Sequence, residues 1–173
     1  MDIERIKKSI RNVPDFPKPG IQFKDITTLL QDSDVFQETI DIFYQQFKDK
    51  EIETVVGIES RGFIFAAPLA LKLDCKFALV RKPGKLPSDT VAEEYKLEYG
   101  SDVIEMHQDA IQIGDRVLVV DDLIATGGTA KATGSLVNKL GGEIVSYAFL
   151  IELLDLKGAD FLCTNSVFSI IKY

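Results

Sequence analysis

Residues 117–129 read VLVVDDLIATGGT: aliphatic side chains, then two acids, then a Gly-Gly pair between threonines. The unbroken aliphatic run at 117–120 indicates a strand buried on both faces, which is typical of a parallel sheet covered by helices on both sides. Gly127 and Gly128 predict a tight turn, and the pattern from there to Leu140 predicts a helix. In an open parallel sheet, ligands bind at the carboxyl ends of strands, so this strand–turn–helix unit is a candidate ligand site.

The turn has the composition of a phosphate-binding loop. Glycines let backbone N–H groups approach an anion, and the start of the following helix adds unpaired N–H donors and the positive end of its dipole. Threonine hydroxyls can donate further hydrogen bonds, whereas carboxylates suit the vicinal hydroxyls of a ribose. The predicted phosphoribosyl-binding residues are Asp121, Asp122, Ala125, Thr126, Gly127, Gly128 and Thr129. The alternative is that the acids only cap the turn and the glycines only permit it.

Other nucleotide motifs do not match. Gly57 and Gly62 have the spacing of a P-loop, but Phe63 occupies the position of its lysine, and no Gly-x-Gly-x-x-Gly occurs.

The rest of the chain alternates apolar runs with helical patterns, which indicates the α/β class. Strands are expected at 54–58, 77–80, 116–120 and 144–151, with a fifth, edge strand at 168–172. Helices are expected at 2–11, from a cap at Ser33 to Phe47, at 61–73 around Pro68, and at 127–140. Residues 81–112 break this rhythm, so we expect a mobile excursion with a hairpin near 95–98.

Composition excludes several classes of protein. The 173 residues are 46% hydrophobic and carry 20 basic against 27 acidic side chains, which predicts one soluble, cytoplasmic domain and argues against nonspecific nucleic-acid binding. Cys75, Cys163 and the single His107 are too few for a Cys/His zinc site or a two-histidine mechanism. We expect packed cysteines and a hydrogen-bonding role for His107.

Residues 117–129 resemble the phosphoribosyl diphosphate signature of the type I phosphoribosyltransferases, and the chain up to about Gly158 resembles the adenine-specific members of that family. Four further segments carry the resemblance: FPKPGIQFKDI at 16–26, ESRGF at 59–63, RKPGKLP at 81–87 and LEYG at 97–100. In the family these correspond to a base-binding hood, a pyrophosphate loop, the entry to a mobile loop, and the place where that loop closes. The implied fold is a parallel central sheet flanked by helices, in a single domain over 1–173 with a hood at about 1–32 and a mobile loop at about 82–100.

The resemblance also implies roles for individual residues. Its pyrophosphate-binding set is Glu59, Ser60, Arg61, Arg81, Lys82 and Lys85, with a cis peptide at Glu59–Ser60. Arg61 can bind an anion bidentately, while lysines act as point charges. A solvated basic surface is the alternative for the run at 81–85.

The base site implied by the resemblance is Gln22, Phe23 and Lys24. Phe23 would stack on a purine, and the backbone around Gln22 and Lys24 would read its edge. The alternative is that Phe16 and Phe23 only form a hydrophobic staple around the proline-rich turn. Glu98 is the candidate for interaction with the purine or the developing charge, with Arg61 as its catalytic partner.

The implied reaction converts adenine and phosphoribosyl diphosphate to AMP and pyrophosphate in purine salvage. Magnesium would arrive on the substrate without direct protein ligands, and a homodimer is implied. A 6-oxopurine transferase is the nearest alternative, although 145–150 offers mainly Ser146 and Tyr147 as polar groups. A noncatalytic sensor of phosphoribosyl diphosphate is the other, but the chain shows no basic helix and no segment left over for a DNA-binding module.

The role of Glu98 gives a first prediction. Glu98→Ala should lower turnover more than about tenfold, because a positioned acid/base or charge acts on the transition state. Steady-state kinetics of the variant and the parent measure the effect, and a change within about twofold contradicts the role.

Overall fold

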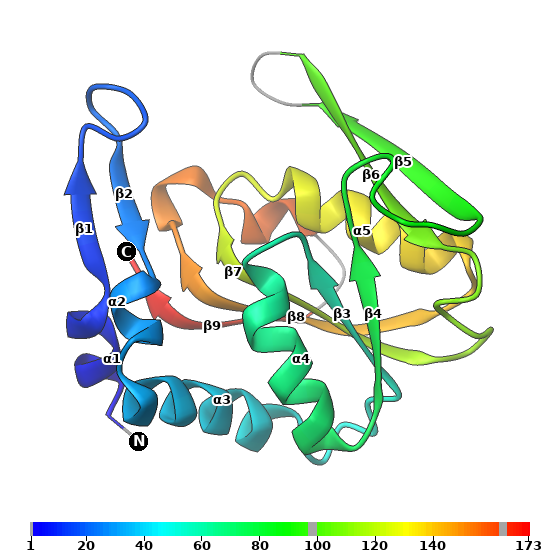
Figure 1. Cartoon of the computed structure of the whole chain (residues 1–173), viewed down its shortest axis with the longest axis horizontal. Coiled ribbons are helices and arrows are strands. Elements are labelled where there is room, and N and C mark those ends of the chain that lie inside the picture. The colour runs from blue at the N-terminus through cyan, green and yellow to red at the C-terminus, as the bar shows by residue number, and fades with distance from the viewer. Residues whose placement is uncertain (1, 97–99, 163–165) are drawn as a thin grey trace.

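The computed structural model describes residues 2–96, 100–162 and 166–173. A five-stranded parallel sheet in the order β4-β3-β7-β8-β9 forms its centre, which confirms the expected architecture (Figure 1). The strands are β3 (Thr54–Ile58), β4 (Lys76–Val80), β7 (Arg116–Ile124), β8 (Glu143–Glu152) and β9 (Ser166–Lys172). The sheet edge formed by β9 was also expected.

Helices cover both faces of this sheet because its central strand is apolar on both faces. Leu118 and Val120 of β7 pack in the core cluster that includes α3 (Ser33–Phe47) and α4 (Gly62–Leu73). Val117 and Val119 pack in a second cluster with α5 (Gly128–Lys139). All four side chains have no exposed surface, as the two-residue period of a doubly covered strand requires.

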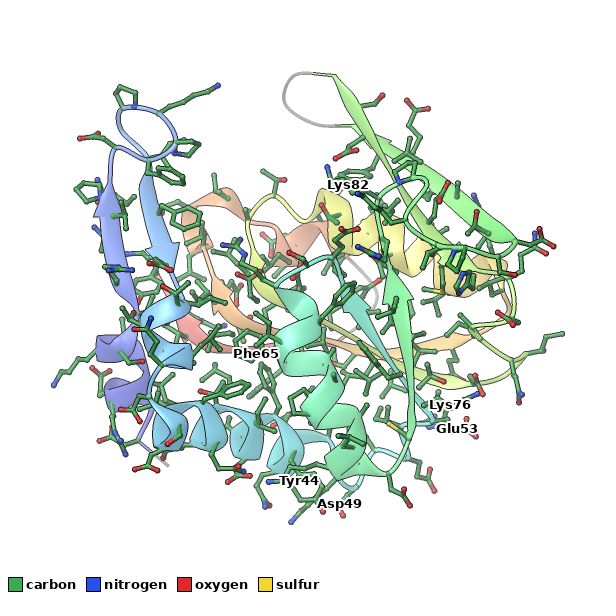
Figure 2. All side chains as sticks on the ribbon, viewed as in Figure 1. Tyr44, Asp49, Glu53, Phe65, Lys76 and Lys82 are labelled. Carbon is green, nitrogen blue, oxygen red and sulfur yellow. The ribbon has the colours of Figure 1, made fainter. Side chains whose placement is uncertain are left out.

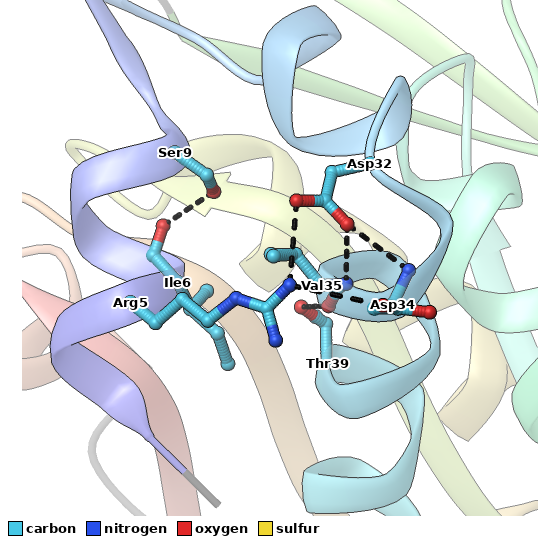
Figure 3. A network of polar contacts seen from close by, with 7 residues as sticks. All are labelled: Arg5, Ile6, Ser9, Asp32, Asp34, Val35 and Thr39. Carbon is cyan, nitrogen blue, oxygen red and sulfur yellow. Dashed lines mark hydrogen bonds and ion pairs between the residues drawn. The ribbon is translucent and has the colours of Figure 1, made fainter.

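The N-terminal helix α1 (Ile3–Ser9) is held against α3 by a polar network (Figure 3). Asp32 caps α3: its Oδ1 accepts from the backbone N–H groups of Asp34 and Val35, both at 3.1 Å. Arg5 donates to the other carboxylate oxygen at 3.4 Å. The predicted cap at Ser33 is therefore wrong by one residue, because Asp32 has the extended backbone of a cap while Ser33 is already helical.

Two antiparallel hairpins project from the core. The first joins β1 (Arg11–Pro14) to β2 (Gln22–Asp25) and leads into α2 (Thr27–Leu30). The second joins β5 (Thr90–Lys96) to β6 (Ser101–His107) and is longer than the hairpin expected near 95–98. Figure 1 shows the two hairpins on opposite sides of the connection between β7 and α5.

Smaller features complete the description. Two 3-10 helices, η1 (Leu154–Leu156) and η2 (Ala159–Leu162), connect β8 to β9. His107 accepts a hydrogen bond from the Ser88 N–H at 3.4 Å, as expected of a hydrogen-bonding histidine. Within the described ranges, the chain has no helix with the length and apolarity to cross a membrane.

Candidate active site

The connection from β7 to α5 forms the centre of the site. Residues 125–127, which we call the phosphate loop, end at Gly127, whose φ of 82° lies in the left-handed region that favours glycine. A cavity of about 90 Å³ is lined by Asp121 and by every residue from Ala125 to Thr129. The structure thus brings six of the seven predicted phosphoribosyl-binding residues to one small cavity, beside the helix start that supplies N–H donors; Asp122 is not among the lining residues.

The acidic pair belongs to the strand itself. β7 continues to Ile124, beyond the expected end at Val120, so Asp121 and Asp122 both lie within the strand. Consecutive side chains of a strand point to opposite faces of the sheet. The Asp122 N–H donates to Asp121 Oδ1 at 2.8 Å, and Asp122 is only 3% exposed. The acids are therefore held by the sheet and do not act as caps of the turn.

Burial raises the pKa of both carboxyl groups. For Asp121 the charge of Asp122 raises the pKa further, whereas the Arg61 guanidinium opposes the rise at Asp122. Arg61 Nε lies 3.0 Å from Asp122 Oδ2, yet that buried oxygen accepts no hydrogen bond from the described residues. The contact between Arg61 and Asp122 is therefore an ion pair at a buried carboxylate oxygen.

Arg61 also reaches the N-terminal hairpin. Its guanidinium carbon lies 5.4 Å from the centre of the Phe23 ring. A cavity of about 380 Å³ opens here, and it is lined by Val13, Phe16, Phe23, Asp25, Ile26, Thr27 and Arg61. Its largely apolar wall and aromatic ring suit a flat heterocycle, and Arg61 connects this cavity to the acidic pair.

The two aromatic residues of the hairpin contact each other. Phe16 and Phe23 meet edge to face with ring centres 5.2 Å apart, so the staple interpretation describes a real contact. Phe23 nevertheless lines the cavity, so packing and binding are compatible roles.

The side chains of Gln22 and Lys24 have partners outside this cavity. Both bond to Asn12, at 2.7 and 3.0 Å, and Lys24 Nζ also lies 4.0 Å from the centre of the Tyr173 ring. Recognition of a base by the backbone of these two residues stays a prediction.

The predicted pyrophosphate loop has the expected cis peptide at Glu59–Ser60. Glu59 accepts from the Lys82 N–H at 2.7 Å and from Arg81 Nη2 at 3.1 Å, and these donors hold its pKa below the usual range. Arg81 also donates to the Lys85 carbonyl oxygen at 3.2 Å. Glu59 therefore fixes the chain that leaves β4.

The basic side chains do not converge on Arg61 in this structure. Lys82 Nζ lies 2.5 Å from Asp102 Oδ2 on β6, and this hydrogen bond raises the pKa of Lys82. Figure 2 shows Lys82 at the end of the molecule that carries the second hairpin, with Lys76 and Glu53 at the opposite end. The sequence analysis missed Asp102, because no local pattern connects it to Lys82.

Glu98, the predicted acid/base, lies outside the described residues. The described residues also hold no group of three or more His, Cys, Asp or Glu side chains arranged for a metal ion.

Comparison with known proteins agrees with this geometry. The family model described as "Phosphoribosyl transferase domain" matches residues 25–171. Adenine phosphoribosyltransferase 1 of Triticum aestivum is 54% identical over 170 residues, which cover 98% of this chain and 94% of that protein.

Solved structures agree as well. The crystal structure of adenine phosphoribosyltransferase from Thermoanaerobacter pseudethanolicus has a TM-score of 0.97 at 47% identity, covering 99% of this chain and 100% of that one. The enzyme from Saccharomyces cerevisiae, solved with adenine and an imino-altritol bisphosphate, has a TM-score of 0.93 at 40% identity, with 98% of both chains covered.

The buried acids give the second prediction. The double variant Asp121→Asn with Asp122→Asn should lose turnover by about 100-fold or more, because the charge facing the ligand is removed while the shape is kept. Kinetics with circular dichroism as the folding control measure this, and near-normal turnover contradicts the role.

The single variant Asp121→Asn serves as the stability control. Because the folded state raises the pKa of Asp121, the charged form destabilises the fold above that pKa, and the penalty disappears as pH falls below the unfolded value. Urea denaturation should show the variant at least as stable as the parent at pH 8, with any advantage shrinking toward about pH 4.

Proposed function

Because the chain belongs to the phosphoribosyltransferase family, we propose that it transfers the 5-phosphoribosyl group of phosphoribosyl diphosphate to adenine, releasing AMP and pyrophosphate. The observation that carries the proposal is the double contact of Arg61. One guanidinium group lies 3.0 Å from the buried acid at the sugar site and 5.4 Å from the aromatic ring at the base cavity. A sugar and a purine held at these two places are neighbours, as the reaction requires.

The chemistry is a substitution at the anomeric carbon. A bond forms from a ring nitrogen of adenine to that carbon, and the bond from the carbon to the pyrophosphate oxygen breaks with its electron pair. The proton on that ring nitrogen is released to a base, the role for which Glu98 is the candidate. The phosphate loop and the start of α5 hold the 5′-phosphate, and Asp121 and Asp122 hold the ribose hydroxyls. Their negative charge also favours the positive charge that develops on the sugar ring.

The leaving group is a polyanion, and we assign it to the side of the site at Ser60 and Arg61. Magnesium enters as part of the substrate, bound to phosphoribosyl diphosphate, and neutralises the departing pyrophosphate. Lys82 and Lys85 can add charge when the segment at 82–100 closes over the site. Closure of this mobile loop would bring Glu98 to the purine and exclude water, which competes as a nucleophile.

We assign base selectivity to the hood, which we place at residues 1–32 of a single domain. The polar groups that could have selected a 6-oxopurine lie away from the base cavity. Ser146 donates to the Ser166 carbonyl oxygen at 2.7 Å, and Tyr147 is 4% exposed in the cluster beneath α5. Neither is among the residues that line the base cavity. The two groups that could have favoured a 6-oxopurine are therefore engaged elsewhere, and adenine is the preferred base.

A base panel tests the function directly. Adenine, hypoxanthine, guanine and orotate are each supplied with magnesium and phosphoribosyl diphosphate while pyrophosphate release is measured. Adenine should exceed every other base by about 100-fold or more in kcat/KM, since unpaired polar groups penalise the wrong base. Equal use of a 6-oxopurine contradicts the selectivity, and no pyrophosphate with any base supports the sensor alternative.

A homodimer, which the resemblance implies, and a cytoplasmic location, which the composition indicates, belong to the same proposal. Sedimentation equilibrium should give twice the chain mass of 19.3 kDa, and a monomer at micromolar concentration contradicts the dimer. Cell fractionation tests the location, and recovery outside the cytoplasmic fraction contradicts it.

A further inference from the structure

The segment between β8 and β9 lies directly against the phosphate loop. We call residues 153–162 the support segment. At its start, the Leu153 N–H donates to the Ile124 carbonyl oxygen at 3.0 Å, immediately before the phosphate loop. At its end, the Phe161 ring centre lies 4.0 Å from Lys131 Nζ on α5, and Leu162 is only 6% exposed in the α5 core cluster. Both ends are thus tied to the elements that hold the loop.

Gly158, in the middle of this segment, makes the closest approach. A Cβ atom added to Gly158 would lie 2.8 Å from the backbone nitrogen of Gly127 and closer still to the Ala125 carbonyl oxygen. A Cβ on Gly127 would in turn lie 2.5 Å from the Gly158 carbonyl oxygen. Two backbones therefore pack on each other with no side chain between them.

The need for glycine at 158 differs from the need at 127. Gly127 has a φ of 82°, so its backbone conformation alone disfavours other residues. The φ of Gly158 is not positive, so its backbone conformation does not require glycine. At Gly158 the missing side chain serves the contact itself. The neighbours are backbone atoms, which cannot rotate away as the end of a flexible side chain can.

We propose that Gly158 is a positioning residue for the 5′-phosphate. Its lack of a side chain lets the support segment pack against the phosphate loop, and this packing places the N–H groups of the loop within hydrogen-bond distance of the ligand. The inference rests on the proposed function, because it assumes a phosphorylated ribose in that loop. Backbone N–H donors bind an oxygen well only within about 2.7–3.2 Å. A methyl group at 158 would press on the backbone of Ala125 and Gly127, so we expect it to shift the phosphate loop, and misplacement near 1 Å can cost about 100-fold.

The test is Gly158→Ala, with affinity for AMP measured by calorimetry and the KM of each substrate by kinetics. We expect AMP affinity to fall about tenfold or more, and the KM of phosphoribosyl diphosphate to rise similarly. The KM of adenine should stay within about twofold, because the base cavity lies at the first hairpin and no residue of the phosphate loop or the support segment lines it.

The matched control is Gly114→Ala. Gly114 has a φ of 87° and no atom within 4 Å of an added Cβ, so alanine strains the backbone without touching the site. It should lower thermal stability and leave AMP affinity unchanged. A Gly158→Ala protein that behaves in the same way, losing stability but not AMP affinity, overturns the inference.

Two further outcomes are distinct. If the parent protein binds no AMP, the proposed function fails and this inference falls with it. If Gly158→Ala does not accumulate as folded protein, Phe161→Ala tests the same support segment, because Phe161 is 49% exposed and its loss spares the core. AMP affinity should then fall about two- to fivefold, from loss of the cation–π contact with α5, and unchanged affinity overturns the inference.

Discussion

Burial of β7 on both faces is the constraint on which this molecule is built. Four consecutive aliphatic residues, 117–120, have no exposed surface, and strands β3 and β8 pair with β7 on either side. A strand in that position has fixed direction, register and depth. Whatever follows it is delivered to the carboxyl edge of the sheet, where the acids and the phosphate loop lie between the two hairpins.

The site imposes a cost on the fold. Asp121 and Asp122 lie next to each other in a strand, burial raises the pKa of both, and the guanidinium group of Arg61, the N-cap residue of α4, provides compensating positive charge. Two adjacent acids whose pKa values are both raised oppose stability, and such a local conflict is typical of a functional site.

Two of the basic residues predicted to bind pyrophosphate form ion pairs within the chain. Arg81 bonds to Glu59 and Lys82 to Asp102, so both side chains pair with acids of the chain itself in this structure. Glu59 differs from Asp102 because it also holds the backbone of Lys82. One acid therefore fixes the start of the loop, while the other accepts hydrogen bonds from the side chains of Lys82 and Tyr95.

Local pattern alone determined the parallel sheet, the strand–turn–helix unit, the phosphate loop and the acids beside it, because burial on both faces and glycine-dependent turns leave direct marks in neighbouring residues. Three features were predicted less accurately: the cap of α3, the end of β7 beyond Val120, and the hairpin at 90–107. Each of them depends on hydrogen bonds to a neighbouring segment. The tertiary structure alone decided that Arg61 lies between Asp122 and Phe23, that Asp102 holds Lys82, and that Gly158 touches the phosphate loop. These contacts join residues far apart in the chain, and only the packing of the sheet brings them together.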